Sequence, residues 1–380
     1  MILAIDASRN RSGGAIAHLI GILTYADPKK FGIKKIHVWS YRKLLSALPK
    51  HYWLEIHNPH ELEKGIFSQV YWQYFKFRKE LNRYKCDILL NTDAGTIGRF
   101  KPNVTMSRDM LSYEKNEMKR YIYTLSWIRL WVLRYIQNNS FKNASGVIFL
   151  TNYAADVIQS YCGSLKNIQI IPHGIHEIFR TIDRDEKSTS LINQRIIHCL
   201  YVSNALPYKH QWNVIKAISF LRNKGYKVEL KLVGVGIGPS QHLIDKAAAK
   251  FDPLNNFIKQ HDFVDNSQLV PYLEEADIFI FASSCENMPV TLIEAMASKI
   301  PIACSNIGPM PEILKDGGEY FNPEKPDEIA KAVEKLIINE SERKNYVKRS
   351  TELASFFSWK RCSDETFFFL MSTYKNTIIK

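Results

Sequence analysis

The feature that most constrains the fold is an alternation of short apolar runs with helical stretches, which occurs in both halves of the chain. In the first half, strands are predicted at 2–6, 36–39, 88–90, 104–106 and 147–150. In the second half, strands are predicted at 196–202, 228–233, 278–281, 300–303 and 320–321, with helices near 210–224, 240–250, 267–275, 290–298 and 326–338. This strand–helix order predicts parallel sheets, so we expect two doubly wound α/β domains in tandem.

The length and composition are those of a two-domain globular protein. With 380 residues, of which 46% are hydrophobic and 23% charged, each half can bury a core of its own. No apolar run reaches the roughly 18–20 residues that cross a bilayer, and the first residues lack the pattern of a signal peptide. Six cysteines lie far apart without a CxxC pair, which argues against a zinc site or disulfide framework and predicts a cytoplasmic location.

The net charge of +13 is unevenly distributed along the sequence. Residues 1–175 contain 25 Lys and Arg against 12 Asp and Glu, whereas residues 176–380 contain 26 of each kind. The whole excess therefore belongs to the first half. Nucleic acid, an anionic membrane and a polyanionic substrate are all compatible with such a charge. A nucleic-acid-binding protein is the weaker hypothesis, because no recognised nucleic-acid module is visible.

Two glutamates follow the predicted strand at 278–281. Glu286 falls in the loop after the strand, and Glu294 falls in the following helix, within the apolar stretch E-A-M-A. A carboxylate can accept two hydroxyl hydrogen bonds at once, which suits a sugar diol. The backbone N–H groups of Val290 and Thr291, near the start of this helix, could receive a diphosphate. The alternative is an acidic helix cap and a solvated surface glutamate.

Five stretches resemble, in order and spacing, the motifs of the retaining GT-B glycosyltransferases of glycosyltransferase family four. Residues 286–297 with Pro301 resemble the glutamate signature of that family, 171–175 its P-N-G-V, 202–209 its G-R-L-x-x-x-K, 232–236 its L-V-G-x-G, and 308–314 its G-x-x-E-I-I. The resemblance covers nearly the whole second half and, more loosely, the first. It implies two Rossmann-like domains that face each other across a cleft: a basic acceptor-binding domain at 1–175 and a nucleotide-sugar-binding domain at 176–360. The helix at about 361–380 is expected to pack back on the first domain.

The resemblance also implies residue roles. As catalytic residues, Glu286 would lie near the hydroxyls of the donor sugar, and Lys209 would neutralise the donor diphosphate. Glu294 would hold the nucleotide ribose. The remaining donor contacts would come from Gly13 and Gly14, which let the backbone approach the diphosphate, and from the segment around Phe263 and Val264, which reads the base.

The sequence departs from the family pattern at two places. Asn204 stands where the family has an arginine, so a cation for the diphosphate is missing or is supplied by Arg9 or Arg11. The usual E-G-F-G is E-N-M-P at 286–289, and its proline removes one backbone donor. Arg108 could contact a phosphate of donor or acceptor, with a surface ion pair to Asp109 as the alternative.

Residues 119–136 are predicted to form one helix that carries arginines among aromatic and aliphatic residues. An interfacial helix on anionic lipid, with Arg129 and Arg134 reaching the headgroups, is one interpretation. A core helix with one basic edge is the other. His18 is predicted to be a core histidine, and His173 to shape the chain between the domains.

The resemblance implies a retaining, metal-independent hexosyltransferase without a cofactor. Its donor would be a UDP- or GDP-sugar. Its acceptor would be a saccharide linked to undecaprenyl diphosphate, a precursor of O-antigen, capsule or lipopolysaccharide. We expect peripheral association with the inner face of the cytoplasmic membrane. The alternative that the sequence keeps open is a catalytically silent partner that binds a nucleotide and transfers nothing.

Overall fold

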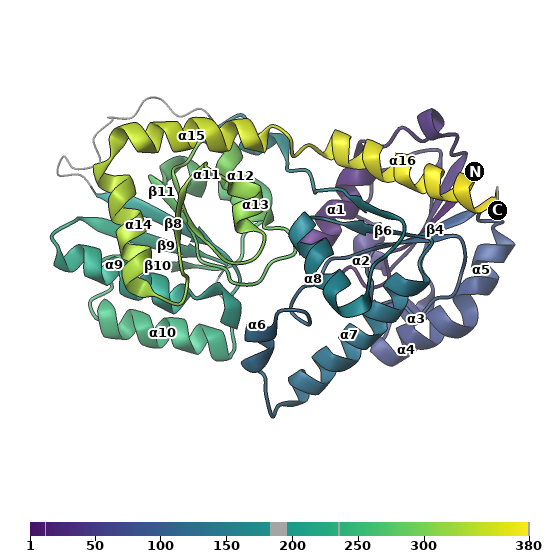
Figure 1. Cartoon of the computed structure of the whole chain (residues 1–380), viewed down its shortest axis with the longest axis horizontal. Coiled ribbons are helices and arrows are strands. Elements are labelled where there is room, and N and C mark those ends of the chain that lie inside the picture. The colour runs from purple at the N-terminus through teal and green to yellow at the C-terminus, as the bar shows by residue number, and fades with distance from the viewer. Residues whose placement is uncertain (12, 183–195, 235, 379–380) are drawn as a thin grey trace. The chain divides into compact units, whose positions relative to one another are not determined.

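The computed structural model describes residues 1–11, 13–182, 196–234 and 236–378, which belong to two compact units (Figure 1). Unit 1 comprises Met1–Gly174 and Ser358–Lys380, and unit 2 comprises Ile175–Phe357. The sequence predicts boundaries after residues 175 and 360, and the contacts divide the chain after 174 and 357. Each unit is an α/β structure built on a parallel sheet, as the alternation of apolar runs predicts.

The described residues of unit 1 contain a seven-stranded sheet in the order β3-β2-β1-β4-β5-β6-β7, with every neighbouring pair parallel. Its strands are β1 (Ile2–Asp6), β2 (Lys35–Trp39), β3 (Leu54–His57), β4 (Ile88–Asn91), β5 (Asn103–Met106), β6 (Gly146–Phe149) and β7 (Ile168–Ile170). Strands β4, β5 and β6 are buried along their whole length, because helices cover both faces of a parallel sheet. The strand order reverses between β1 and β4, so the loops after these two strands diverge.

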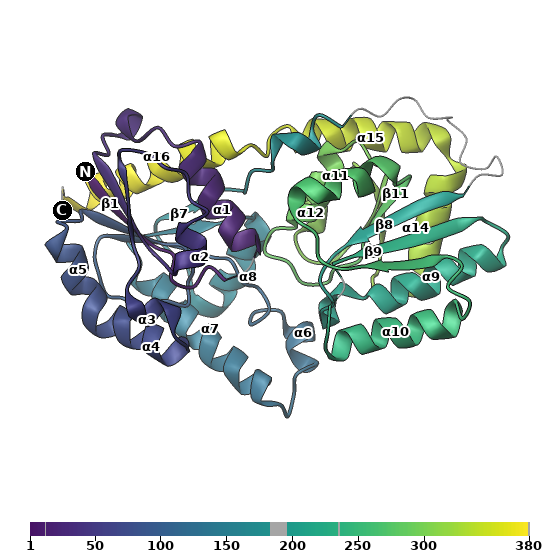
Figure 2. The same cartoon turned by 180° about the vertical axis from the view of Figure 1, so that it is seen from behind.

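The helices of unit 1 include one from the far end of the chain. They are α1 (Gly13–Thr24), η1 (Pro28–Phe31), α2 (Arg42–Leu45), α3 (His60–Glu63), α4 (Ile66–Tyr71), η2 (Trp72–Lys76), α5 (Phe77–Arg83), α6 (Lys115–Lys119), α7 (Leu125–Asn143), α8 (Asn152–Cys162) and α16 (Trp359–Ile378). Helix α16 packs against α1, as Figure 2 shows. The Trp359 indole fills the space beside Gly21, where a Cβ would come within 2.3 Å of the ring. Only glycine therefore lets the two helices approach this closely.

Unit 2 repeats the arrangement with a six-stranded parallel sheet in the order β10-β9-β8-β11-β12-β13 among its described residues. Its strands are β8 (Ile197–Val202), β9 (Val228–Val233), β10 (Ile258–His261), β11 (Ile278–Phe281), β12 (Ile302–Ser305) and β13 (Glu319–Phe321). Its helices are η3 (Glu177–Phe179), η4 (Pro207–Lys209), α9 (Gln211–Asn223), α10 (Pro239–Phe251), α11 (Asn266–Glu275), α12 (Val290–Ala297), α13 (Met310–Leu314), α14 (Pro326–Ile338) and α15 (Glu340–Ala354). Here the strand order reverses between β8 and β11.

Three strands have no counterpart in the sequence prediction, and all three lie at sheet edges. They are β3 and β7 in unit 1 and β10 in unit 2. Each has partly or fully exposed positions, and β10 contains Lys259 and Gln260. An edge strand with an exposed face lacks the continuous apolar run that marks a central strand. The sequence pattern therefore misses them.

The single helix predicted at 119–136 is wrong. Helix α6 ends at Lys119, Tyr123 has a left-handed φ of 65°, and α7 begins at Leu125 after Thr124 caps it. The side chain of Thr124 accepts a hydrogen bond from Trp127 N at 3.3 Å. A left-handed residue is costly for a side chain other than glycine and interrupts the helix.

The two arginines of α7 lie on different faces of the helix. Arg134 is buried, donates to Ser112 O at 3.3 Å, and places its guanidinium carbon 3.9 Å from the Trp131 ring centroid. The prediction that Arg134 reaches lipid headgroups is therefore wrong, whereas Arg129 is exposed. Exposed apolar side chains lie on α6–α7 together with the exposed Lys119, Arg120 and Arg129, and we call the apolar group the α7 apolar surface. It comprises Ile122, Tyr123, Leu125, Ile128, Trp131, Val132 and Tyr135. None of the described helices is long and apolar enough to cross a bilayer.

Candidate functional site

The strongest candidate site in unit 2 lies at the carboxyl ends of the neighbouring strands β8 and β11, where the strand order reverses. In doubly wound sheets, ligands bind beyond the carboxyl ends of the strands at such a reversal of strand order. The loops after β8 and β11 are joined here by hydrogen bonds. Ser284 N donates to Tyr208 O at 2.9 Å, and Ser284 Oγ lies 2.7 Å from Nε2 of the buried His210. His210 has a left-handed φ of 49°, which turns the chain from η4 into α9.

The two predicted catalytic residues meet at this point. Lys209, at the end of η4, forms an ion pair with Glu286 in the loop after β11, and both side chains are about 15% exposed. The Lys209 ammonium lies 5.7 Å from the Phe281 ring centroid and 5.5 Å from that of Tyr208. Tyr201 on β8 donates its hydroxyl to Lys209 O at 2.7 Å, which fixes the backbone. The site therefore holds a cation and an anion side by side, on a scaffold of strands.

Glu294 occupies the buried side of α12. It is 4% exposed, and no described side chain bonds its carboxyl. Burial alone raises the pKa of Glu294 to about 8, so the carboxyl is largely protonated at neutral pH. The alternative interpretation of Glu294 as a solvated surface glutamate is therefore wrong. A buried carboxyl with unused hydrogen-bonding capacity is available to a hydroxyl-bearing ligand.

Helix α12 begins at Val290, with Pro289 at its N-cap. The first amides of a helix have no partner within it and can bind an anion. In this structure Val290 N donates to Met288 O at 3.0 Å, so it could reach a ligand only by releasing that bond. Thr291 is the second residue of the helix.

The loops after β8, β9 and β10 lie at the same end of the parallel sheet and contain Asn204, Gly234, Phe263 and Val264. Gly234 follows β9 with a φ of 96°, and a Cβ there would lie 3.0 Å from Ser203 O in the loop after β8. Glycine is thus required both by conformation and by the close backbone approach. Asn204 is exposed, and its carbonyl accepts from Gln211 at 3.1 Å. Phe263 and Val264 follow β10, and Phe263 is 67% exposed.

The glycines predicted to cradle a diphosphate belong to unit 1. Gly13 and Gly14 form the first turn of α1, and a Cβ at either meets nothing within 4 Å. The protein itself therefore does not demand glycine at these positions. Arg108 Nη2 donates to Gly14 O at 2.8 Å, which ties the loop after β5 to the start of α1. Asp109 accepts from Leu111 N at 3.0 Å, and the ion pairs of the described residues do not join it to Arg108.

The two arginines predicted to replace the missing cation differ in their surroundings. Arg9 lies at the carboxyl end of β1, with its Nε 4.0 Å from the Asp93 carboxylate. Arg11 donates to Leu62 O at 2.6 Å, and its guanidinium carbon stacks 3.8 Å from the Tyr41 ring centroid. Arg11 is therefore held within unit 1, and Arg9 is the less constrained of the two.

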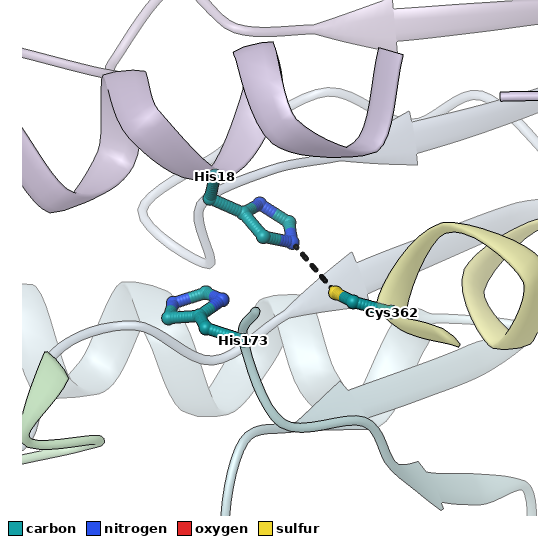
Figure 3. Close-up of side chains that lie close together, drawn as sticks. All are labelled: His18, His173 and Cys362. Atoms are coloured by element: carbon teal, nitrogen blue, oxygen red, sulfur yellow. Dashed lines mark hydrogen bonds between the residues drawn. The ribbon is translucent and has the colours of Figure 1, made fainter. Parts of the chain in front are cut away.

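His18, His173 and Cys362 meet inside unit 1 (Figure 3). All three are buried, and the separation between His18 Nε2 and Cys362 Sγ is 3.8 Å. Their ligating atoms lie within 4.8 Å of one another, compared with about 3.5 Å between sulfur and nitrogen in a tetrahedral zinc site. Burial and the positive charge of Arg108 lower the pKa of both histidines, and the same charge opposes a bound cation. The cluster therefore fits a packing contact of uncharged side chains between α1, the 173–174 segment and α16. Metal-independent transfer stays a prediction.

Comparison with known proteins finds sequence relatives of this chain. Residues 183–353 match the family model described as glycosyl transferases group 1. Protein CapJ of Staphylococcus aureus is 27% identical over 217 residues, which cover 57% of this chain and 52% of that protein. O-antigen chain mannosyltransferase B of Escherichia coli is 30% identical over 111 residues, which cover 29% of each. The matches thus span about half the length of these relatives or less.

Similar solved structures cover the whole chain. Sucrose-phosphate synthase from Thermosynechococcus elongatus superimposes with a TM-score of 0.74 at 13% identity, covering 100% of this chain and 99% of that one. HepE of Anabaena in complex with UDP-glucose gives a TM-score of 0.72 at 16% identity, with the same coverage. The predicted fold class is therefore confirmed: the chain has the GT-B fold, with two parallel-sheet α/β units.

Proposed function

We propose that the chain is a retaining glycosyltransferase that moves a sugar from a UDP- or GDP-sugar to a hydroxyl of a lipid-linked saccharide. The observation that carries the proposal is the arrangement at the β8–β11 reversal. The Lys209–Glu286 pair lies there, and the helix that follows the Glu286 loop holds Glu294, a buried carboxyl without a described side-chain partner. The match of residues 183–353 to glycosyl transferases group 1 supports the same conclusion.

In this proposal each residue has a distinct contact with the donor. Glu294 accepts hydrogen bonds from the ribose hydroxyls. These bonds supply what the carboxyl loses when burial removes it from water. Lys209 contacts the diphosphate, and the amides of Val290 and Thr291 at the start of α12 contribute further donors. Glu286 faces the hydroxyls of the sugar, and Phe263 with Val264 lies against the base. Gly13 and Gly14 let a backbone amide of unit 1 approach the diphosphate, and Asn204, Arg9 and Arg108 are additional polar groups for phosphate contacts.

The chemistry proceeds at one face of the sugar. The bond between the anomeric carbon and the diphosphate oxygen breaks, the acceptor oxygen forms its bond on the same face, and the acceptor proton passes to the departing diphosphate. Glu286 is already paired with Lys209, so it acts by orienting the sugar and the ammonium and not as a nucleophile. Lys209 stabilises the charge that gathers on the leaving diphosphate. No metal or other cofactor takes part in this scheme.

A membrane-held acceptor is supported by the α7 apolar surface and by the charge of the first half of the chain. Leu125 and Tyr123 are 85% and 100% exposed, which is unusual for residues this apolar. An interfacial surface that buries such side chains in lipid, next to cationic residues, binds anionic membranes. Peripheral association with the inner face of the cytoplasmic membrane is therefore part of the proposal. The relative named O-antigen chain mannosyltransferase B supports an undecaprenyl-diphosphate-linked saccharide as the acceptor, in surface polysaccharide synthesis.

A second candidate function is a catalytically silent partner that binds a nucleotide sugar. Asn204 favours it, because it replaces a cation that the family uses on the diphosphate. Both candidates predict donor binding, and only the enzyme predicts transfer to an acceptor.

The donor half of the proposal is tested by thermal unfolding in the presence of UDP-, GDP- and ADP-sugars. One UDP- or GDP-sugar should raise the melting temperature of the wild type, because a ligand that binds only the folded state stabilises it. The Glu294→Ala variant should lose that shift, and the Glu274→Ala variant, altered at an exposed glutamate of α11, should keep it. A wild type that none of these donors stabilises would contradict the assignment of the donor site.

A further inference from the structure

A cavity of about 260 Å³ lies in unit 1, and none of the residues assigned above lines it. It is formed between the η2–α5 segment and the loop that precedes β5. The side chains relevant here are Gln73, Tyr74, Phe77, Arg78, Arg99 and Phe100. Its volume is close to the lower end of the range for small-molecule sites, which suits one sugar ring with a phosphate. We call it the Arg78–Arg99 pocket.

Gln73 lines the pocket and has an unused, buried hydrogen-bond acceptor. The side chain is 2% exposed, and its amide nitrogen donates to Asp6 Oδ2 at 2.9 Å and to Ser8 Oγ at 3.1 Å. Its Oε1 is buried and has no hydrogen-bond partner among the described residues. An amide oxygen in this position requires a donor, such as a ligand hydroxyl. Because Asp6 ends β1, Gln73 also connects the pocket to the strand reversal of unit 1, where a doubly wound sheet binds ligands.

Arg78 and Arg99 give the pocket a positive charge that nearby acidic groups do not cancel. Both are exposed, and neither takes part in an ion pair among the described residues. Glu80, on the same helix, instead accepts from the indole nitrogens of Trp39 at 2.6 Å and Trp72 at 2.9 Å. Asp6 lies behind Gln73, bonded to its amide, and burial raises the pKa of Asp6. Two unpaired guanidinium groups beside one cavity suit a phosphate.

The backbone next to the pocket is unusual. Residues Trp72–Lys76 form a π-helical turn between α4 and α5, and such turns occur frequently at functional sites. On the same stretch of chain, Phe67, Tyr71 and Phe75 are 88%, 49% and 56% exposed, and we call them the aromatic ridge. One stretch of chain thus contributes both to a polar, cationic pocket and to an exposed apolar ridge.

We propose that the Arg78–Arg99 pocket binds the glycosyl phosphate portion of an anionic lipid-linked saccharide. Arg78 and Arg99 hold the phosphate, Gln73 accepts a hydrogen bond from a sugar hydroxyl, and Tyr74 and Phe100 border the ring. The aromatic ridge lies against the lipid to which the phosphate is attached. The inference rests on the proposed function and extends it by assigning a place in unit 1 to the acceptor.

The test is calorimetric titration of the full chain with glucose 1-phosphate, inorganic phosphate and glucose. Glucose 1-phosphate should bind more tightly than either of the other two. Arg78→Ala and Arg99→Ala should each weaken its binding by about tenfold or more, because each removes a charge-assisted contact. The matched control is Lys79→Ala, which removes an exposed charge next to Arg78 that does not line the pocket. Equal binding by wild type and both arginine variants, or no binding to the wild type, would overturn the inference.

Vesicles of phosphatidylglycerol separate a glycosyl phosphate site from a site for bulk lipid headgroups. If the arginine variants lose vesicle binding but keep glucose 1-phosphate binding, the pocket serves headgroups and the glycosyl part of the inference fails. Stabilisation of the same variants by nucleotide sugars should equal that of the wild type, since the donor residues are untouched. A wild type that no nucleotide sugar stabilises would contradict the proposed function. The titration with glucose 1-phosphate would still test the Arg78–Arg99 pocket.

Discussion

The ammonium of Lys209 and the carboxylate of Glu286 form an ion pair although 77 positions separate them in the sequence. Each residue follows a central strand, and these two strands are neighbours at the point where the sheet order reverses. The pair is mostly shielded from solvent, so each charge depends on the other. In the proposed donor complex, the diphosphate shares Lys209 with Glu286, and the ligand completes an arrangement that already exists.

Loss of the lysine should impair transfer far more than folding. We expect Lys209→Ala to reduce transfer by about 10²–10³-fold, as observed when one preorganised group facing transition-state charge is removed. The Lys216→Ala variant, altered at an exposed lysine of α9, should transfer at the wild-type rate. A radiolabelled-donor assay measures both, and a Lys209→Ala enzyme with full activity would refute the role of this residue.

The double variant Lys209→Ala/Glu286→Gln separates stability from catalysis. The single variant leaves a poorly hydrated carboxylate without its partner and should lower the free energy of unfolding by about 1–3 kcal/mol. The additional Glu286→Gln change removes that charge and should recover most of the lost stability in urea unfolding, while transfer stays as low as in Lys209→Ala. Recovery of transfer together with stability would mean that the pair is structural only.

The buried Glu294 predicts a pH-dependent stability. Its pKa rises from the usual 4.5 to about 8 in the folded chain, so between these values the folded state binds a proton that the unfolded state has lost. The free energy of unfolding of the ligand-free protein should therefore fall as pH rises from 4.5 to 8, by at most about 1.4 kcal/mol per pH unit from this group. Above pH 8 the contribution is constant.

Urea unfolding at pH 5 and pH 8 measures this slope. The Glu294→Gln variant should lose the contribution, because glutamine does not ionise, whereas Glu274→Gln should keep the wild-type slope. An unchanged slope in Glu294→Gln would show that this carboxyl is not the group responsible.

Gly234 should tolerate no side chain. Alanine there combines a left-handed φ with a Cβ that lies 3.0 Å from the carbonyl oxygen of Ser203, so the loop after β8 must move. We expect Gly234→Ala to destabilise the protein by about 1–3 kcal/mol and to weaken donor binding. Gly236→Ala is the matched control, since a Cβ there meets nothing within 4 Å. Thermal unfolding compares the two variants, and equal melting temperatures would contradict the requirement for glycine at position 234.

The α7 apolar surface should determine membrane binding. The double variant Leu125→Glu/Ile128→Glu removes two exposed apolar side chains, each worth about 1.5 kcal/mol or more when buried in lipid, and should weaken binding to anionic vesicles by at least about tenfold. Ile237→Glu changes a residue of unit 2 that is 99% exposed and should have no effect. Vesicle co-sedimentation distinguishes them, and binding that survives the double variant would exclude this surface.

The sequence predicted the central strands well, because a strand covered on both faces leaves a continuous apolar run. The strand at 228–233 and the helix at 326–338 agree with β9 and α14 to the residue. Edge strands such as β3 and β10 escaped because one side of each is exposed. The 119–136 helix failed for a local reason, since the left-handed Tyr123 is not marked by glycine or proline.

The site was predictable only in part. The order of motifs indicated Lys209 and Glu286, whereas their direct pairing depends on strand neighbours that are not adjacent in sequence. Arg134 was misassigned because it lies five positions after Arg129, about 140° around α7, so the two side chains cannot share one face of the helix. The Arg78–Arg99 pocket and the His18–His173–Cys362 cluster had no signal in the spacing of their residues, since their members come from separate segments.

The most direct test of the central claim is transfer of radiolabelled sugar to undecaprenyl-diphosphate-linked saccharide in membranes, with the nucleotide sugar that stabilises the wild type as donor. We predict a labelled lipid-linked product whose new linkage keeps the anomeric configuration of the donor, and its near-complete loss in Lys209→Ala and Glu294→Ala. Stabilisation by a donor without any labelled product would instead identify a silent partner, and a product of inverted configuration would contradict the retaining mechanism.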